Sequence, residues 1–257
     1  DAGGQTGAPQ PCTLAGSVRV CSGVSLTGHD STLMNFAHEL SHTLSPRSYD
    51  LYGYADATHG CLNQGATLMA CTAGGPFSDT SGMFLDPYHR SLYGWAGLSQ
   101  TWDGITVTTR TIEVDAVDNP WGHLELLTLT NNMSGEAITF EYRGQYSDYD
   151  DFVDGLIVWY SKLDGNNRPF EITSLVDPSK NDGSVFVLGP LAGCLLDPND
   201  VDSRGRVRTL GEGRYSMRWS DGFVTTFNVA KNFFFEDQFT WLVSWDTFDG
   251  NPNQCTF

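Results

Sequence analysis

Residues 38 to 42 read His-Glu-Leu-Ser-His, and this run constrains the local fold more than any other part of the sequence. Side chains four residues apart lie on one face of an α-helix, so a helix would point both histidines in the same direction. Apolar residues at helical spacing accompany the pair, and they predict a helix over residues 31 to 44 whose apolar stripe packs into a core. The stripe consists of Leu33, Phe36, Ala37, Leu40 and Leu44.

The spacing of the two histidines also suits a metal. Two imidazoles on one helical face can bind one zinc ion, and the carboxylate of Glu39 would lie next to that ion. Such a carboxylate can take a proton from water that zinc has acidified to a pKa of about 7, and pass it to a leaving amine. The run therefore predicts a zinc-dependent endopeptidase in which Glu39 is the catalytic residue. The alternative is a pair of partly exposed histidines on an ordinary amphipathic helix.

A hydrolytic zinc site needs a third protein ligand and an open position for water. In the pattern H-E-x-x-H-x-x-G-x-x-H, the glycine and the third histidine fall on Ser45 and Ser48, and neither serine is a suitable ligand. Asp50, Asp56 and His59 follow a few residues later. Spacing alone leaves all three open, because a loop can carry any of them to a metal.

A resemblance favours Asp50. The histidine pair followed by Tyr49-Asp-Leu-Tyr-Gly53 resembles the His-Glu-x-x-His and Asp-Leu-Tyr run of the immune inhibitor A family of secreted zinc metallopeptidases. In that family the aspartate is the third zinc ligand. The resemblance therefore implies His38, His42 and Asp50 as metal ligands, with His59 as the alternative for the third. Asp50 lies later than in the family pattern, and Ser45 stands where the family has glycine.

The resemblance continues downstream over matching segments that together span residues 31 to 160. Ala66-Thr-Leu-Met-Ala-Cys71 is similar to the methionine turn of the family, which implies that Met69 lies beneath the metal. Leu85 to Trp95 is similar to the short helix that ends in Gly-Trp. Glu141-Tyr-Arg143 and the apolar run over residues 155 to 160 also resemble family segments. Tyr88, His89 and Tyr93 are candidate donors to the oxyanion that forms during hydrolysis.

The expected fold class is α+β. The resemblance implies a zincin-type catalytic region with an active-site helix over residues 1–98. Beyond Gly97, short runs of alternating polarity between Gly, Asn and Asp turns predict a β-rich, sandwich-like domain over residues 99–257. The expected strands cover residues 104–114, 123–130, 137–143, 155–161, 184–189, 206–210 and 222–229.

The segment before the zinc motif is short for a peptidase of this kind. Only 37 residues precede His38, and they are rich in Gly, Pro, Ser and Thr, which supports a strand or two. Two interpretations follow. Either this half of the active site is reduced, or a second chain from proteolytic processing supplies the missing N-terminal subdomain.

Charge and composition limit the partners. The chain has 14 basic and 31 acidic residues and a net charge of −17, so its surface repels nucleic acid phosphates and anionic membranes. No apolar run reaches the roughly 18 residues that a membrane span requires. We therefore expect a protein or peptide substrate, with no nucleic acid and no membrane span.

The six cysteines predict disulfides and a secreted protein. Disulfides are the favoured interpretation because no C-x-x-C pair suggests a zinc-thiolate site, although the sequence leaves other connectivities open. The expected pairs are Cys12 with Cys21, Cys61 with Cys71, and Cys194 with Cys255.

Clusters of aspartate raise the prospect of calcium as a second cofactor. Carboxylates in turns suit this hard cation, and secreted peptidases use it to hold loops, but a solvated acidic loop gives the same pattern. The first candidate cluster is Asp148, Asp150, Asp151 and Asp154, and the second is Asp197, Asp200 and Asp202.

A second class of function also fits the sequence. A secreted binding or adhesion module could keep a degenerate, inactive zinc site, and the altered loop at Ser45 and the short N-terminal segment favour this alternative.

Overall fold

The structure, a computed structural model, describes a little over half of the chain. The described residues are 5–6, 13–15, 18–20, 25–26, 33–45, 48, 67–69, 84–105, 111–114, 124–143, 155–162, 185–191, 194–197, 209–235 and 238–248.

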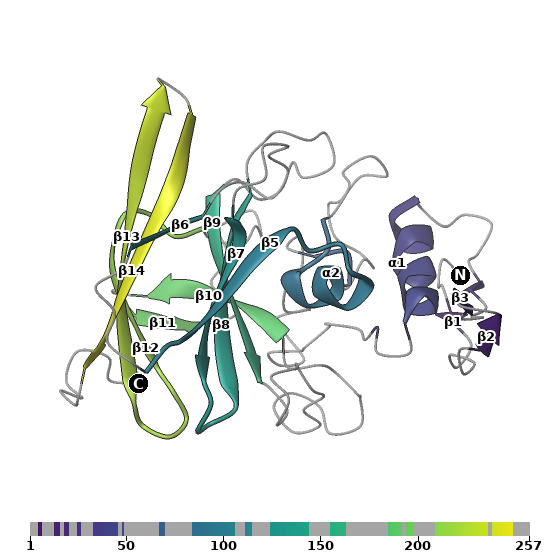
Figure 1. The fold of residues 1–257 in the computed structure, drawn as a ribbon, viewed down its shortest axis with the longest axis horizontal. Coiled ribbons are helices and arrows are strands. Elements are labelled where there is room, and N and C mark those ends of the chain that lie inside the picture. The colour runs from purple at the N-terminus through teal and green to yellow at the C-terminus, as the bar shows by residue number, and fades with distance from the viewer. Residues whose placement is uncertain are drawn as a thin grey trace.

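The N-terminal elements are small. Among the residues just given, two helices lie between the fourth and fifth strands: α1 (Leu33–Leu44) and α2 (Pro87–Tyr93) (Figure 1). Four short strands precede α1 and form two antiparallel pairs, β1 with β4 and β2 with β3. They are β1 (Gln5–Thr6), β2 (Thr13–Ala15), β3 (Val18–Val20) and β4 (Ser25–Leu26).

The other ten strands of the described chain form one sheet in the order β5-β7-β8-β9-β10-β11-β12-β13-β14-β6. Neighbours run antiparallel except for the parallel pairs β5 with β7 and β11 with β12. The strands are β5 (Leu98–Asp103), β6 (Thr111–Val114), β7 (Leu124–Asn131), β8 (Glu136–Arg143), β9 (Gly155–Lys162), β10 (Val185–Leu191), β11 (Cys194–Asp197), β12 (Gly213–Arg218), β13 (Val224–Phe235) and β14 (Gln238–Phe248).

The two halves of this sheet face each other across one apolar core. Side chains from β7, β8 and β9 join side chains from β12, β13 and β14 in a single buried cluster. Phe140 on β8 meets Phe227 on β13 with ring centroids 4.9 Å apart, and Tyr142 stacks on Phe239 of β14. This packing produces a sandwich, in which burial of large apolar side chains is the main stabilising contribution.

Strands β8 and β9 are buried on both faces, so few of their polar side chains reach the solvent. Alternate residues such as Phe140 and Val158 point into the sandwich core. The opposite face carries Glu141, Arg143 and Trp159, and α2 covers this face through Arg90. The sheet therefore provides the platform on which α2 is held.

The expected α+β class with a zincin-type catalytic region is wrong for the residues that the structure describes. They contain two short helices against fourteen strands. Helical periodicity is strong in the histidine motif, and the described residues before α1 form the short strands β1 to β4. A single amphipathic helix does not make a helical catalytic region. The boundary expected near residue 98 stays a prediction.

None of the helices in the described segments combines the length and apolar character that a membrane span requires.

Candidate metal centre

The two histidines of α1 converge on one point. His38 and His42 lie on successive turns, and their Nε2 atoms are 3.3 Å apart with the rings nearly perpendicular at 81°. His38 is buried and His42 is half-buried. The helix therefore places two imidazole nitrogens at the spacing of two ligands of one ion.

The other ring nitrogens define the tautomers. His38 Nδ1 lies 2.7 Å from the backbone oxygen of Leu68, and His42 Nδ1 lies 3.0 Å from that of Ser48. A carbonyl oxygen only accepts hydrogen bonds, so each Nδ1 carries a proton, and in a neutral ring Nε2 then presents a lone pair. In two neutral rings the lone pairs that face each other at 3.3 Å would repel, and a cation between them would remove that repulsion.

This geometry fits zinc. Ligands bound to zinc at about 2.0–2.1 Å in tetrahedral arrangement lie about 3.3 to 3.4 Å from each other. The 3.3 Å separation of the two Nε2 atoms agrees with that value. Metal-binding histidines also usually donate the second ring N–H to a backbone carbonyl or a carboxylate, as both do here.

The acceptor for His38 belongs to the short turn Thr67–Met69. The Leu68 amide donates to the Phe84 oxygen at 3.1 Å, which holds the turn against the residues before α2. Met69 is fully buried. Met69, the residue of the predicted methionine turn, therefore directly follows Leu68, which accepts the hydrogen bond of His38.

Thr67 links this turn to α2. Its hydroxyl donates to Asp86 Oδ2 at 2.7 Å and accepts from the backbone amides of Met69 and Asp86, each at 3.2 Å. Asp86 also accepts from the His89 amide at 3.0 Å and from His89 Nδ1 at 2.7 Å. All of these groups are buried, so the turn and the start of α2 form one unit.

Local sequence explains why α2 begins and ends where it does. Asp86 is its N-cap, Pro87 occupies the first turn, and Gly94 ends the helix in the left-handed conformation with φ of 75°. Burial by itself raises the pKa of Asp86. The electrostatic interaction with His89 and hydrogen bonds from His89 and Thr67 outweigh burial and hold the pKa of Asp86 below its ordinary value.

The other end of α2 supports the second histidine. The Tyr93 hydroxyl donates to the Ser41 oxygen at 2.9 Å and lies 2.5 Å from Ser48 Oγ. Ser48 is buried, and its backbone oxygen is the acceptor for His42. Tyr93 therefore joins α2 both to α1 and to the residue that orients His42.

Buried charges fix α2 to the sheet. Arg90 lies 3.1 Å from Glu141 and 3.5 Å from Glu125, and Arg143 pairs with Glu141 at 3.1 Å. Trp159 donates from its ring N–H to Glu141 at 2.6 Å. Glu141 thus connects the helix that supports the histidines to two central strands.

Two buried phenols give a test in alkaline solution. Burial, with the nearby charge of Asp86, raises the pKa of Tyr93, and burial with the hydrogen bond and charge of Glu136 raises that of Tyr160. The folded state therefore keeps protons that the unfolded state loses near the ordinary value of 10.0, so stability falls as the pH rises above it. We therefore expect these two phenols to ionise at higher pH than exposed tyrosines. A pH titration that records phenolate absorbance together with circular dichroism measures this.

In the variant that carries both Tyr93→Phe and Tyr160→Phe, the part of the phenolate absorbance change that occurs at high pH should be smaller. Ionisation of every tyrosine in one early step, with the fold intact, would contradict the assignment.

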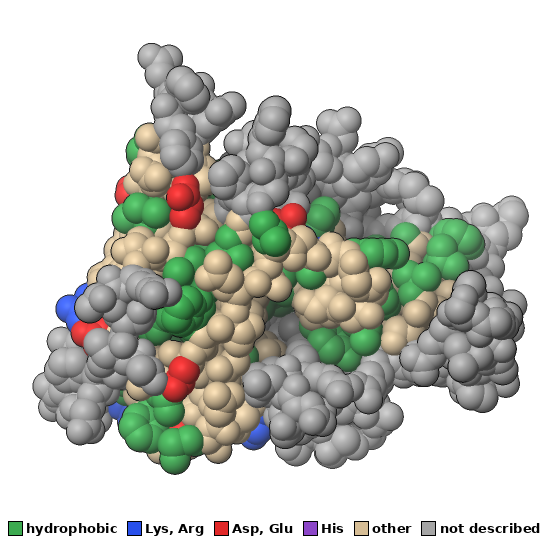
Figure 2. Space-filling view, viewed as in Figure 1, with side chains coloured by type: hydrophobic (Ala, Val, Ile, Leu, Met, Phe, Trp, Pro, Cys, Tyr) green, Lys and Arg blue, Asp and Glu red, His purple; other side chains and the backbone are tan. Residues whose placement is uncertain are grey.

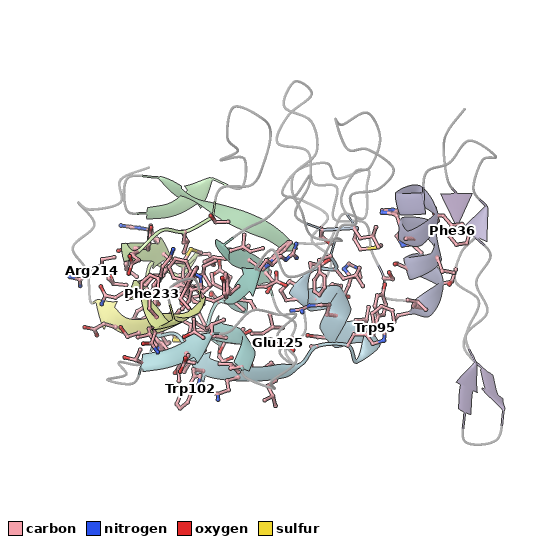
Figure 3. All side chains as sticks on the ribbon, turned by 90° about the horizontal axis from the view of Figure 1, so that it is seen from above. Phe36, Trp95, Trp102, Glu125, Arg214 and Phe233 are labelled. Atoms are coloured by element: carbon pink, nitrogen blue, oxygen red, sulfur yellow. The ribbon has the colours of Figure 1, made fainter. Side chains whose placement is uncertain are left out.

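The prediction that the apolar stripe of the helix packs into a core is wrong for three of its five residues. Phe36, Leu40 and Leu44 are 47%, 44% and 42% exposed, whereas His38 and Ser41 are buried. Figure 2 shows hydrophobic side chains at the surface at the α1 end of the molecule, and Figure 3 shows Phe36 on the side of α1 away from α2. The polar histidine face, held by hydrogen bonds to the turn and α2, is the face that packs.

Glu39 lies between the two histidines on α1 and is half-buried. Two of the three candidate oxyanion donors have hydrogen-bond partners elsewhere: Tyr93 is bound to Ser41, and His89 is fully buried against Asp86. The third, Tyr88, is half-buried with its ring edge-on to that of His89. The structure thus brings His38 and His42 together, places Met69 next in the chain to the acceptor of His38, and uses His89 and Tyr93 as supports.

Several predicted site residues lie outside the described residues. Within the described part, no three His, Cys, Asp or Glu side chains form a group suited to a metal. Cys194 and Asp197 belong to β11, but their side chains are not described. The residues outside are Asp50, Asp56, His59, Cys12, Cys21, Cys61, Cys71, Cys255, Asp148, Asp150, Asp151, Asp154, Asp200 and Asp202.

Sequence reasoning missed three supporting residues. They are Ser48, which the spacing tests only as a ligand, and Thr67 and Asp86, which no pattern assigns to the site. The only local signal was Asp86 before Pro87, a typical helix start.

Comparison of the chain with protein-family models, with curated proteins and with solved structures finds no match. The likeness to immune inhibitor A metallopeptidases therefore rests on the quoted motifs.

Proposed function

We propose that the protein is a secreted zinc-dependent endopeptidase. The observation that carries this proposal is the pair of Nε2 atoms 3.3 Å apart, with both Nδ1 atoms directed at backbone oxygens. Two zinc ligands whose outer ring N–H groups are hydrogen-bonded adopt an arrangement of this kind, which supports the proposal. The proposal depends on this site and not on a zincin fold.

The roles follow from the chemistry of the side chains. His38 and His42 hold the metal, and Asp50 is the proposed third ligand, with His59 as the alternative. When bound, zinc acts as a Lewis acid and makes a water nucleophilic near neutral pH. Glu39 accepts the proton of the attacking water and returns it to the amine as the peptide bond breaks. Glu39 directly follows His38 on α1 and is half-buried, which supports this role.

The test combines metal analysis with hydrolysis of a broad peptide library. We expect about one zinc per chain, cleavage that a strong chelator abolishes, and recovery of cleavage on addition of zinc but not of magnesium. His38→Ala and His42→Ala should each lose both the metal and the cleavage. Cleavage that persists after complete metal removal would overturn the proposal.

The same experiment separates the alternative class. Zinc bound through His38 and His42 without any peptide cleavage would identify a binding module with an inactive zinc site.

A further inference from the structure

We infer that α2 is the positioning element of the metal centre, because it orients both imidazoles through two separate hydrogen-bond relays. The inference rests on the proposed function and deepens it by naming Thr67, Asp86 and Tyr93 as positioning residues. None of the three is a proposed ligand. Each helps to hold in place a backbone oxygen that accepts a hydrogen bond from an imidazole N–H.

The first relay runs from the N-terminus of α2 to His38. Asp86 caps the helix and accepts a hydrogen bond from the Thr67 hydroxyl at 2.7 Å. The Thr67 hydroxyl in turn accepts a hydrogen bond from the Met69 amide. The backbone oxygen of Leu68, which lies between them in the chain, accepts from His38 Nδ1 at 2.7 Å. Since Thr67, Asp86 and Met69 are completely buried, water cannot easily replace a lost hydrogen bond.

The second relay runs from the C-terminus of α2 to His42. The Tyr93 hydroxyl donates a hydrogen bond to the Ser41 backbone oxygen and is also hydrogen-bonded to the Ser48 hydroxyl. These two bonds place Ser48 beside α1. The Ser48 oxygen then accepts from His42 Nδ1 at 3.0 Å. One short helix therefore determines the direction of both rings.

The consequence for metal binding comes from the tautomers. An imidazole can bind zinc through Nε2 only when the proton lies on Nδ1. Each relay stabilises that tautomer before metal arrives, and loss of such outer contacts typically weakens metal binding by about 10- to 100-fold.

The test uses Thr67→Val and Tyr93→Phe, which remove one hydroxyl each with little change in shape. Matched controls are Thr128→Val, which removes the hydroxyl paired with Thr139 between β7 and β8, and Tyr215→Phe, which removes the one bound to the Gly211 oxygen. Zinc affinity is measured by competition with a chromophoric chelator. We expect about 10- to 100-fold weaker binding in the first pair and wild-type binding in the controls.

A second measurement does not need zinc. Nitrogen-15 NMR of the metal-free protein reports the tautomer of each histidine, and we expect the Nδ1-protonated form at His38 and His42 in the wild type. Thr67→Val should mix the tautomers at His38 alone, and Tyr93→Phe at His42 alone. Thr67→Ser keeps the hydroxyl and should restore the wild-type result at His38.

These readouts distinguish the two ideas. A wild type that binds no zinc at His38 and His42 contradicts the proposed function, while the tautomer pattern still decides the role of α2. Wild-type zinc affinity and unchanged tautomers in folded Thr67→Val and Tyr93→Phe would overturn the inference.

Discussion

Glu39→Gln is expected to abolish most peptide hydrolysis while zinc remains bound. Glutamine has nearly the size and helix propensity of glutamate, so α1 should form as before. It cannot accept the proton of the attacking water, and loss of a general acid–base group lowers turnover by about 10²- to 10⁴-fold. Glu39 lies between the two histidines and is half-buried, so the change alters the proposed site without disturbing a buried core.

The measurement pairs kcat with zinc stoichiometry and thermal unfolding of the same preparation. Glu212→Gln is the matched control, because Glu212 is exposed and its carboxylate accepts a hydrogen bond from the Lys231 amide, far along the chain from α1. The control should keep wild-type values throughout. Normal turnover by folded, zinc-loaded Glu39→Gln would exclude Glu39 as the catalytic base.

The parts of the fold that the sequence predicted well are those with a strong local signal. The helix expected at residues 31 to 44 is α1 (Leu33–Leu44), since the histidine motif and its neighbours share one periodicity. The strands expected at 137–143 and 155–161 correspond to β8, in which polar and apolar residues alternate, and β9, which is a nearly continuous apolar run. The short helix ending in Gly-Trp is α2.

Other predictions failed because periodicity does not report which face of an element is covered. The stripe of Phe36, Leu40 and Leu44 has the correct helical spacing, yet it is exposed. The opposite face is buried because specific hydrogen bonds hold His38 and Ser41 near the turn and α2. Of the strand expected at 206–210, the structure describes only residues 209 and 210, where Leu210 forms an isolated bridge with Leu156, so that strand stays a prediction.

The supports of the metal centre could not be found from local patterns. Thr67 and Asp86 are separated by 19 residues, Leu68 and His38 by 30, and Tyr93 and Ser41 by 52. A threonine, a serine or a tyrosine with such a role looks like any other polar residue in the sequence. Only the fold of the chain shows that α2 gathers them.

Glu141→Gln is expected to produce the largest loss of stability. The Glu141 carboxylate is completely buried and faces Arg90 and Arg143 at 3.1 Å each, while Trp159 donates to it at 2.6 Å. Removal of one partner from a buried ion pair typically costs about 3–5 kcal/mol, because the remaining charges have already left water. Both guanidinium groups also lie over the Phe84 ring, so moving away to solvent would break further contacts.

Urea unfolding of the metal-free protein is the appropriate measurement, because bound zinc would add its own stabilisation. Glu212→Gln serves as the control and should change stability by no more than about 0.5 kcal/mol, as expected for an exposed position. A loss that small in Glu141→Gln would contradict the view that this carboxylate holds α2 on the sheet. If the view is correct, the same variant should also bind zinc more weakly when folded, since α2 transmits its position to Leu68 and Ser48, the acceptors of the two histidines.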